Sequence, residues 1–115
     1  MRENLIAGLL TDEYSERILV ATYYNLMSAQ ELSEKYDIPI AACYRRIHEL
    51  ERLGLIKCEK EITGEKGKPI KLYKSQLKSA CLLFDKGSFK VRLEFPNDDE
   101  LNGKWIELDI YNESK

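Results

Sequence analysis

The sequence predicts an α+β fold, helical in its first half and built of short strands in its second. Up to residue 53 apolar residues recur three or four positions apart, which is the period of a helix that buries one face. After Gly54 apolar and charged residues alternate, as they do in half-exposed strands. The 115 residues suffice for one main core. We expect two regions, residues 1–78 and residues 79–115.

The first two helices are predicted from their starts. Thr11 can cap a helix from about Asp12 to Tyr24, whose acidic first turn suits the helix dipole. Ser28 and Glu31 have the spacing of a capping box, in which each side chain bonds the other's backbone N–H. The short helix that they open ends near Tyr36.

A third helix is predicted from Pro39 to Leu53, because proline suits a first helical turn and Gly54 suits the left-handed end. We expect its core-facing stripe to be Ile40, Cys43, Ile47, Leu50 and Leu53. A short helix, a tight turn and a longer helix make a helix-turn-helix. The alternating runs Leu55–Ile62 and Ile70–Lys74, joined by a turn-forming segment, add a β-hairpin. A hairpin in this position is a wing, so we expect a winged helix-turn-helix with a three-helix core.

The last third of the chain predicts a small antiparallel β-meander. Its strands are expected at 80–84, 88–95 and 105–111, with a single helical turn beginning at Asn97. Apolar side chains share one face, which a sheet of this size cannot leave in water. We expect this sheet and the N-terminal segment to meet their counterparts across the two-fold axis of a homodimer, although packing within one chain stays an alternative.

Composition narrows the possible functions. No apolar run reaches the ~18–20 residues of a membrane helix, and Leu5–Leu10 is too short for a secretory signal, so we expect a cytoplasmic protein. The net charge is −2, but residues 38–78 carry a balance of +5 and the rest −7, which indicates one face that meets an anion. The cysteines 43, 58 and 81 and the single histidine do not form a zinc pattern. We expect no metal, no cofactor and no enzymatic activity.

The runs MSAQELSEKYDIPIAACYRRIHELERLGLI and EKEITGEKGKPIKLYKS resemble winged helix-turn-helix regulators of the ArsR-like type, in the version common in archaea. The resemblance covers roughly Leu10 to Gln76. It implies a transcriptional regulator that binds double-stranded DNA, with the third helix in the major groove and the wing on the backbone or in the minor groove. The paired cysteines of metal-sensing members are missing. Neither the operator, the direction of regulation nor any effector follows from the sequence.

The candidate DNA contacts lie on the third helix and the wing. A helical wheel places Ala41, Arg45, His48 and Arg52 opposite the core stripe and Ala42 and Tyr44 on its flanks. Arg45 can bond guanine with two donors, the alanines can approach thymine methyls, and Tyr44 and Arg46 suit phosphates. On the wing we expect phosphate contacts from Lys66, Lys68 and Lys71.

Two plainer interpretations stay open. The outward face of the third helix can be a solvated surface with ion pairs such as Arg45–Glu49, and the wing an ordinary charged hairpin in which glutamates dilute the basic character. The whole fold can also serve as a protein-interaction module in a transcription or chromatin complex, since fold alone does not decide function.

Overall fold

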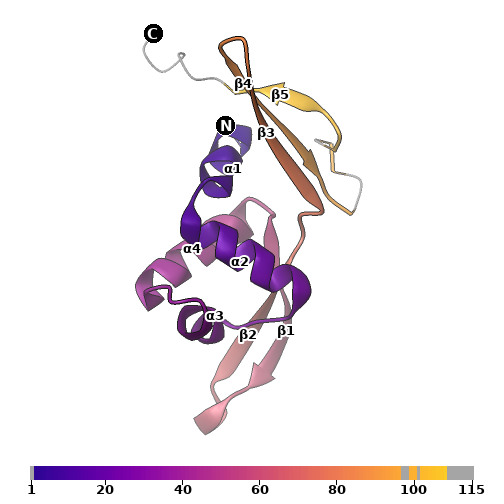
Figure 1. Cartoon of the computed structure of the whole chain (residues 1–115). Helices are drawn as coiled ribbons and strands as arrows, with labels where there is room; N and C mark the ends of the chain where they lie inside the picture. Colours follow the sequence, from indigo (N-terminus) through magenta and orange to yellow (C-terminus); the bar gives the residue numbers. More distant parts are fainter. Residues whose placement is uncertain (1, 97–98, 101, 109–115) are drawn as a thin grey trace. The chain divides into compact units, whose positions relative to one another are not determined.

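The computed structural model describes residues 2–96, 99–100 and 102–108 and confirms the α+β class (Figure 1). Its described residues form the helices α1 (Arg2–Leu10), α2 (Glu13–Tyr24), α3 (Ala29–Lys35) and α4 (Ile40–Arg52). The strands are β1 (Ile56–Thr63), β2 (Pro69–Ser75), β3 (Ser79–Asp85), β4 (Ser88–Glu94) and β5 (Trp105–Glu107). The chain divides into two compact units, a helix–hairpin unit (Leu9–Gln76) and a sheet unit (Met1–Gly8 and Leu77–Lys115). The order of elements in the first unit is compatible with a winged helix.

The structure corrects the predicted cap of α2 and confirms the predicted capping box of α3. Asp12, not Thr11, caps α2: its carboxylate accepts from the Ser15 N–H at 2.9 Å. Both residues can cap a helix, and Asp12 also meets a partner far away in the chain, described below. The capping box of α3 is confirmed, because Ser28 Oγ accepts from the Glu31 N–H at 3.1 Å and Glu31 accepts from the Ser28 N–H at 2.9 Å.

The predicted limits of the third helix are confirmed to within one residue. Pro39 precedes α4, and Gly54 follows it with a φ of 82°, the left-handed conformation that ends a helix. Cys43, Ile47 and Leu50 are buried as expected. The prediction for Ile40 is wrong, because its side chain is 41% exposed at the first position of α4. Leu53, just after the helix, is half-buried.

The hairpin β1–β2 is antiparallel and runs from the base of the helices to a tip at residues 64–68 (Figure 1). A bulge between Cys58 and Lys60 shifts the register, so the alternation of side chains changes along β1. At its base Tyr73 is buried and exchanges two backbone hydrogen bonds with Met27, at 2.8 and 3.3 Å. This bridge ties the segment between α2 and α3 to β2.

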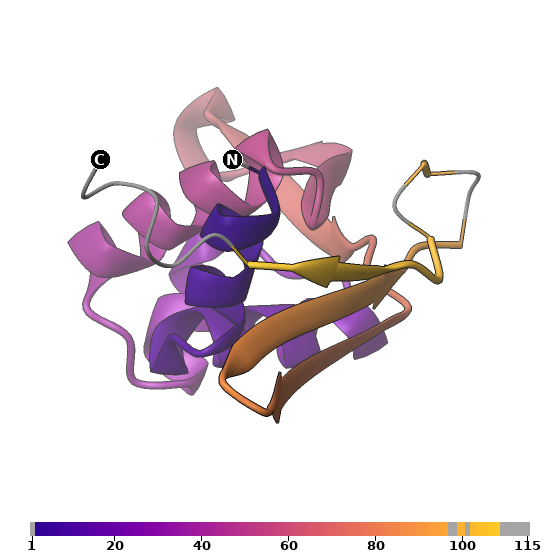
Figure 2. The ribbon, with the colours of Figure 1, turned by 90° about the horizontal axis from the view of Figure 1, so that it is seen from above.

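The sheet unit holds a three-stranded antiparallel sheet in the order β3-β4-β5, which confirms the meander (Figure 2). Lys86 and Gly87, with φ of 51° and 85°, make the tight turn between β3 and β4. Leu82 pairs with Val91 and Phe84 with Phe89, so these apolar side chains share one face as predicted. The predicted strand end at 109–111 and the helical turn's start at Asn97 lie outside the described residues.

The first helix of the chain was not expected from the sequence. Residues 2–8 of α1 belong to the sheet unit, where Arg2 pairs with Asp99 at 3.1 Å and lies 5.6 Å from the ring of Phe95. Ile6 in this helix is fully buried. The N-terminal residues therefore contribute to the core of the sheet unit.

Candidate nucleic-acid interface

The outward face of α4 carries four of the predicted contact residues. Ala41, Tyr44, Arg45 and His48 are all exposed, because the residues three or four positions away from each other share a face and the opposite stripe is buried. Tyr44 keeps 51% of its surface exposed. The structure thus brings these four side chains together on one side of the helix.

Arg45 is the side chain on this face best suited to recognition. Within the described part of the chain it has neither a hydrogen-bond nor an ion-pair partner. The ion pair Arg45–Glu49 of the plainer interpretation is not formed, since Glu49 lies 4.0 Å from Arg46 instead. The guanidinium of Arg45 is therefore available to an anion or to a base edge.

Arg46 lies next to Arg45 in the sequence but is committed to the fold. Its Nε donates to Asp12 Oδ2 at 2.8 Å and its second amino group to Oδ1 at 3.1 Å, a two-pronged ion pair that joins α4 to the start of α2. The guanidinium also lies 5.9 Å from the centre of the Tyr14 ring. The internal ion pair occupies Nε and one amino group of Arg46, and the predicted phosphate contact of Arg46 stays a prediction.

The same ion pair shifts the pKa values of both partners. The hydrogen bond from Arg46, helped by the N–H of Ser15, lowers the pKa of Asp12 from 3.8 to about 2, although burial opposes the shift. The hydrogen bond to Asp12 in turn raises the pKa of Arg46. Both shifts favour the charged forms of the two groups, which is the state in which the ion pair between α4 and the start of α2 forms.

Ala42 lies at the margin of the core, since only 8% of its surface is exposed. It sits one position before the fully buried Cys43, and its short methyl group does not extend past the margin of the core. The predicted contact of Ala42 with a thymine methyl therefore has little exposed surface to use. Ala41, one position earlier, keeps the exposed position that such a contact needs.

The wing presents its lysines to solvent. Lys66, Lys68 and Lys71 are exposed, and none has an ion-pair partner within the described ranges. Lys66 sits at the turn of the tip with a φ of 60°. Lys71 lies opposite Glu61 in the ladder, so part of its charge is offset there. The tip lysines are therefore the more effective pair for an extended anion.

One basic residue on α4 was not among the predicted site residues. Arg52 is exposed and continues the outward line of Ala41, Arg45 and His48 at spacings of four, three and four residues. The helical wheel had already placed Arg52 on this face, because the spacing is visible in the sequence. Lys74, in contrast, is engaged, because its Nζ donates to the Tyr23 carbonyl at 2.6 Å.

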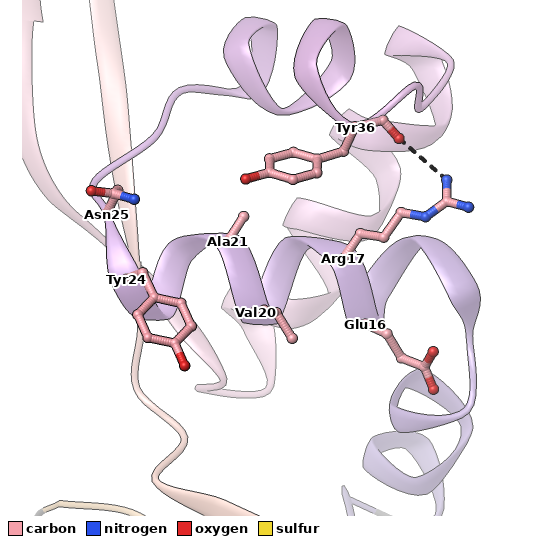
Figure 3. Close-up of a pocket in the computed structure, with 7 residues that line it drawn as sticks. All are labelled: Glu16, Arg17, Val20, Ala21, Tyr24, Asn25 and Tyr36. Carbon is pink, nitrogen blue, oxygen red and sulfur yellow. Dashed lines mark hydrogen bonds between the residues drawn. The ribbon is translucent and has the colours of Figure 1, made fainter.

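A shallow pocket of about 560 Å³ lies between α2 and α3, away from the outward face of α4. Figure 3 shows its lining, in which Arg17 donates to the Tyr36 carbonyl at 3.2 Å. Val20 and Tyr24 line it with 60% and 73% of their surfaces exposed. The pocket is open and mostly apolar, with Glu16 and Arg17 as its charged lining residues. None of the predicted contact residues lines it.

Neither a family model nor a curated protein matches this chain. Three structural features bear on other classes of site. Within the part of the chain that the structure describes, no three histidine, cysteine or acidic side chains gather where they could hold a metal ion. The three cysteines are free thiols, and burial raises the pKa of Cys43. No described helix has the length and apolar character needed to cross a membrane.

Proposed function

We propose that the helix–hairpin unit is a winged helix-turn-helix that binds double-stranded DNA, and that the protein is a sequence-specific transcriptional regulator rather than an enzyme. The observation that carries the proposal is the exposed, unpaired guanidinium of Arg45 on the outward face of α4, beside a neighbouring arginine that the fold uses internally. Arginine is the side chain that most often reads guanine, through two parallel hydrogen bonds.

The arrangement of elements supports this proposal. A short helix, a tight turn and a longer helix precede an antiparallel hairpin, and the Met27–Tyr73 bridge fastens that hairpin to the helices. In this docking mode α4 enters the major groove with its early outward residues, Ala41, Tyr44 and Arg45, towards the bases. His48 and Arg52 follow on the same face and suit the flanking phosphates. The wing lysines Lys66 and Lys68 contact the backbone beside the groove.

The affiliation with ArsR-like regulators is part of the proposal and rests on the resemblance of the sequence alone. A homodimer that binds a palindromic site belongs to the same proposal, because one winged helix covers only a short half-site. The second candidate is a winged-helix module that binds another protein. It is favoured by one observation, the glutamates 59, 61 and 65, which are exposed beside the lysines of the wing.

Selection of binding sites from random duplex DNA, followed by a test of Arg45 variants on the selected site, distinguishes the two candidates. Arg45→Ala should weaken specific binding by about 1–3 kcal/mol and relax the preference at one position per half-site. Its melting temperature should stay unchanged, because the side chain has no internal partner. Arg45→Lys is the matched control: it keeps the charge but loses the two-pronged geometry, so specific binding should fall while binding to random DNA persists.

If no sequence is enriched, or if Arg45→Ala binds the enriched site as tightly as the parent, the DNA-reading role of α4 is wrong. Equal losses on specific and random DNA for both variants would assign Arg45 to a phosphate instead of a base.

A further inference from the structure

Strand β3 forms one edge of the three-stranded sheet, and its sequence is unusual for an edge. In Figure 2 the sheet has β3 and β5 at its two edges with β4 between them. Among the described residues β3 pairs with β4 alone, so its second side has no strand partner. Exposed edges are commonly protected by lysine, proline or a bulge. From Ser79 to Phe84 this strand has none of these and no charge.

The side chains of this edge are apolar and exposed on both faces of the sheet. Leu82 and Phe84 on one face are 42% and 62% exposed, and Leu83 on the other is 40% exposed. The rings of Phe84 and Phe89 contact each other in a tilted arrangement with their centres 4.9 Å apart, and Phe89 is itself 39% exposed. An apolar surface of this kind next to unpaired backbone groups is typical of an interaction site.

The hydrogen-bonding pattern identifies which backbone groups of β3 point outwards. The Leu108 N–H donates to the Phe89 carbonyl at 2.8 Å, so the backbone of Phe89 faces β5. Successive residues of a strand direct their backbone groups to opposite sides, so Lys90 faces β3 and bonds its partner there, Leu83. It follows that Ala80, Leu82 and Phe84 direct their N–H and C=O groups away from the sheet.

We propose that β3 pairs antiparallel with β3 of a second copy of this chain, about a two-fold axis at Leu82. Leu82 then lies opposite Leu82 of the second copy, and Ala80 opposite Phe84. All three outward residues are used, which gives about six backbone hydrogen bonds between the copies. An axis at Cys81 or Leu83 would pair only two of these three outward residues with one another. The two sheets join into one continuous sheet of six strands.

A second copy fits this edge better than an unrelated strand because the sequence of β3 complements itself about this axis. Asp85, the one charged residue of β3, lies opposite Ser79 of the second copy, so no carboxylate faces another carboxylate. A hydroxyl group suits a carboxylate. Lys78 and Lys86 lie just outside the two ends of β3. On the apolar face, the exposed Phe84 of each copy covers the half-buried Ala80 of the other.

This interface deepens the proposed function, since it would supply the dimer that a palindromic DNA site requires. It rests on that function only in this consequence. Self-association is measured without DNA, so a failure of DNA binding leaves the interface standing, and a failure of the interface leaves the contacts of α4 standing.

Sedimentation velocity on the full chain tests the pairing, with the variants Leu82→Glu and Leu82→Lys measured separately and as an equal mixture. The parent should be a dimer at micromolar concentration. Each variant alone sets like charges opposite each other at the axis and should raise the dimer dissociation constant by at least about tenfold. The mixture should recover the dimer, because opposite charges then face each other. Val20→Glu, which adds the same charge at an exposed apolar position of α2, should leave the dimer unchanged.

Leu82→Pro is a test without a charge, since proline removes an outward N–H and is tolerated on edge strands. It should be monomeric, with the circular dichroism of the parent. A parent that is monomeric at 100 µM, a mixture of the two charged variants that stays monomeric, or a Leu82→Pro variant that still dimerises would overturn the proposal.

Discussion

The two β-hairpins of this protein are built alike but have opposite surfaces. β1–β2 carries lysines and glutamates along most of its length, contains a bulge, and is buried only at its base. β3–β4 has a tight two-residue turn, a regular register and an uncharged outer strand with exposed leucine and phenylalanine side chains. The comparison shows that strand pairing alone does not assign a role. The side chains of the first hairpin suit water and anions, whereas the exposed apolar side chains of the second suit another apolar surface.

The largest expected effect concerns the anchor of the first hairpin. Tyr73→Ala should lower the free energy of unfolding by about 3–5 kcal/mol, since it removes a buried ring at the base. Ile62→Ala, in the same hairpin but 40% exposed, should cost less than about 1 kcal/mol. Urea denaturation followed by circular dichroism measures both. Equal losses would mean that the hairpin is held along its whole length and would remove the contrast with β3–β4.

The next prediction compares the lysines at the wing tip with exposed lysines of the sheet unit. Lys66→Gln with Lys68→Gln should weaken binding to specific and random DNA alike and reduce the salt slope of log K by up to about two units. Lys86→Gln with Lys104→Gln removes the same charge from exposed positions of the sheet unit and should leave the slope unchanged. Fluorescence anisotropy between 50 and 300 mM salt gives the slopes. If the two double variants behave alike, the wing tip does not touch phosphate.

The smallest effect concerns the ion pairs that stabilise each unit. Asp12→Asn should cost about 1 kcal/mol at pH 7, because asparagine can still cap α2 but loses the charge opposite Arg46. Since the folded-state pKa of Asp12 lies below its unfolded value, this contribution is full above pH 4 and is lost as the pH falls towards about 2. The stability difference between parent and variant should therefore shrink over that interval.

Glu94→Gln is the matched control for this ion-pair prediction, because the pair Arg92–Glu94 is longer, at 3.4 Å, and more exposed. Its effect on the free energy of unfolding should stay within about 0.5 kcal/mol at any pH. A loss as large as that of Asp12→Asn would show that ion pairs stabilise both units equally.

Features set by neighbouring residues were predictable from the sequence. The capping box at Ser28, the left-handed Gly54 and the tight turn at Lys86–Gly87 each depend on a few adjacent positions. The outward face of α4 was also predictable, because exposed Arg45 and His48 follow from the period of the buried stripe.

Features set by distant residues were not predictable. Asp12 caps α2 while its carboxylate binds Arg46, thirty-four positions away, and no local pattern distinguishes it from Thr11 in this role. For the same reason Arg46 was assigned to phosphate. The helix α1 was missed because its apolar run is short and its apolar residues follow no clear helical face. The bulge after Cys58 contains no glycine that would mark it.

The bridge between Met27 and Tyr73 has a mechanical consequence. Eight residues of β1 extend about 26 Å at ~3.3 Å per residue, so the first hairpin acts as a lever whose tip magnifies any rotation at its base. A tilt of about 5° there would move Lys66 by roughly 2 Å, which is enough to break a hydrogen bond. Two backbone hydrogen bonds at the fulcrum join β2 to the segment that opens α3. They oppose a tilt of the hairpin relative to the segment that opens α3.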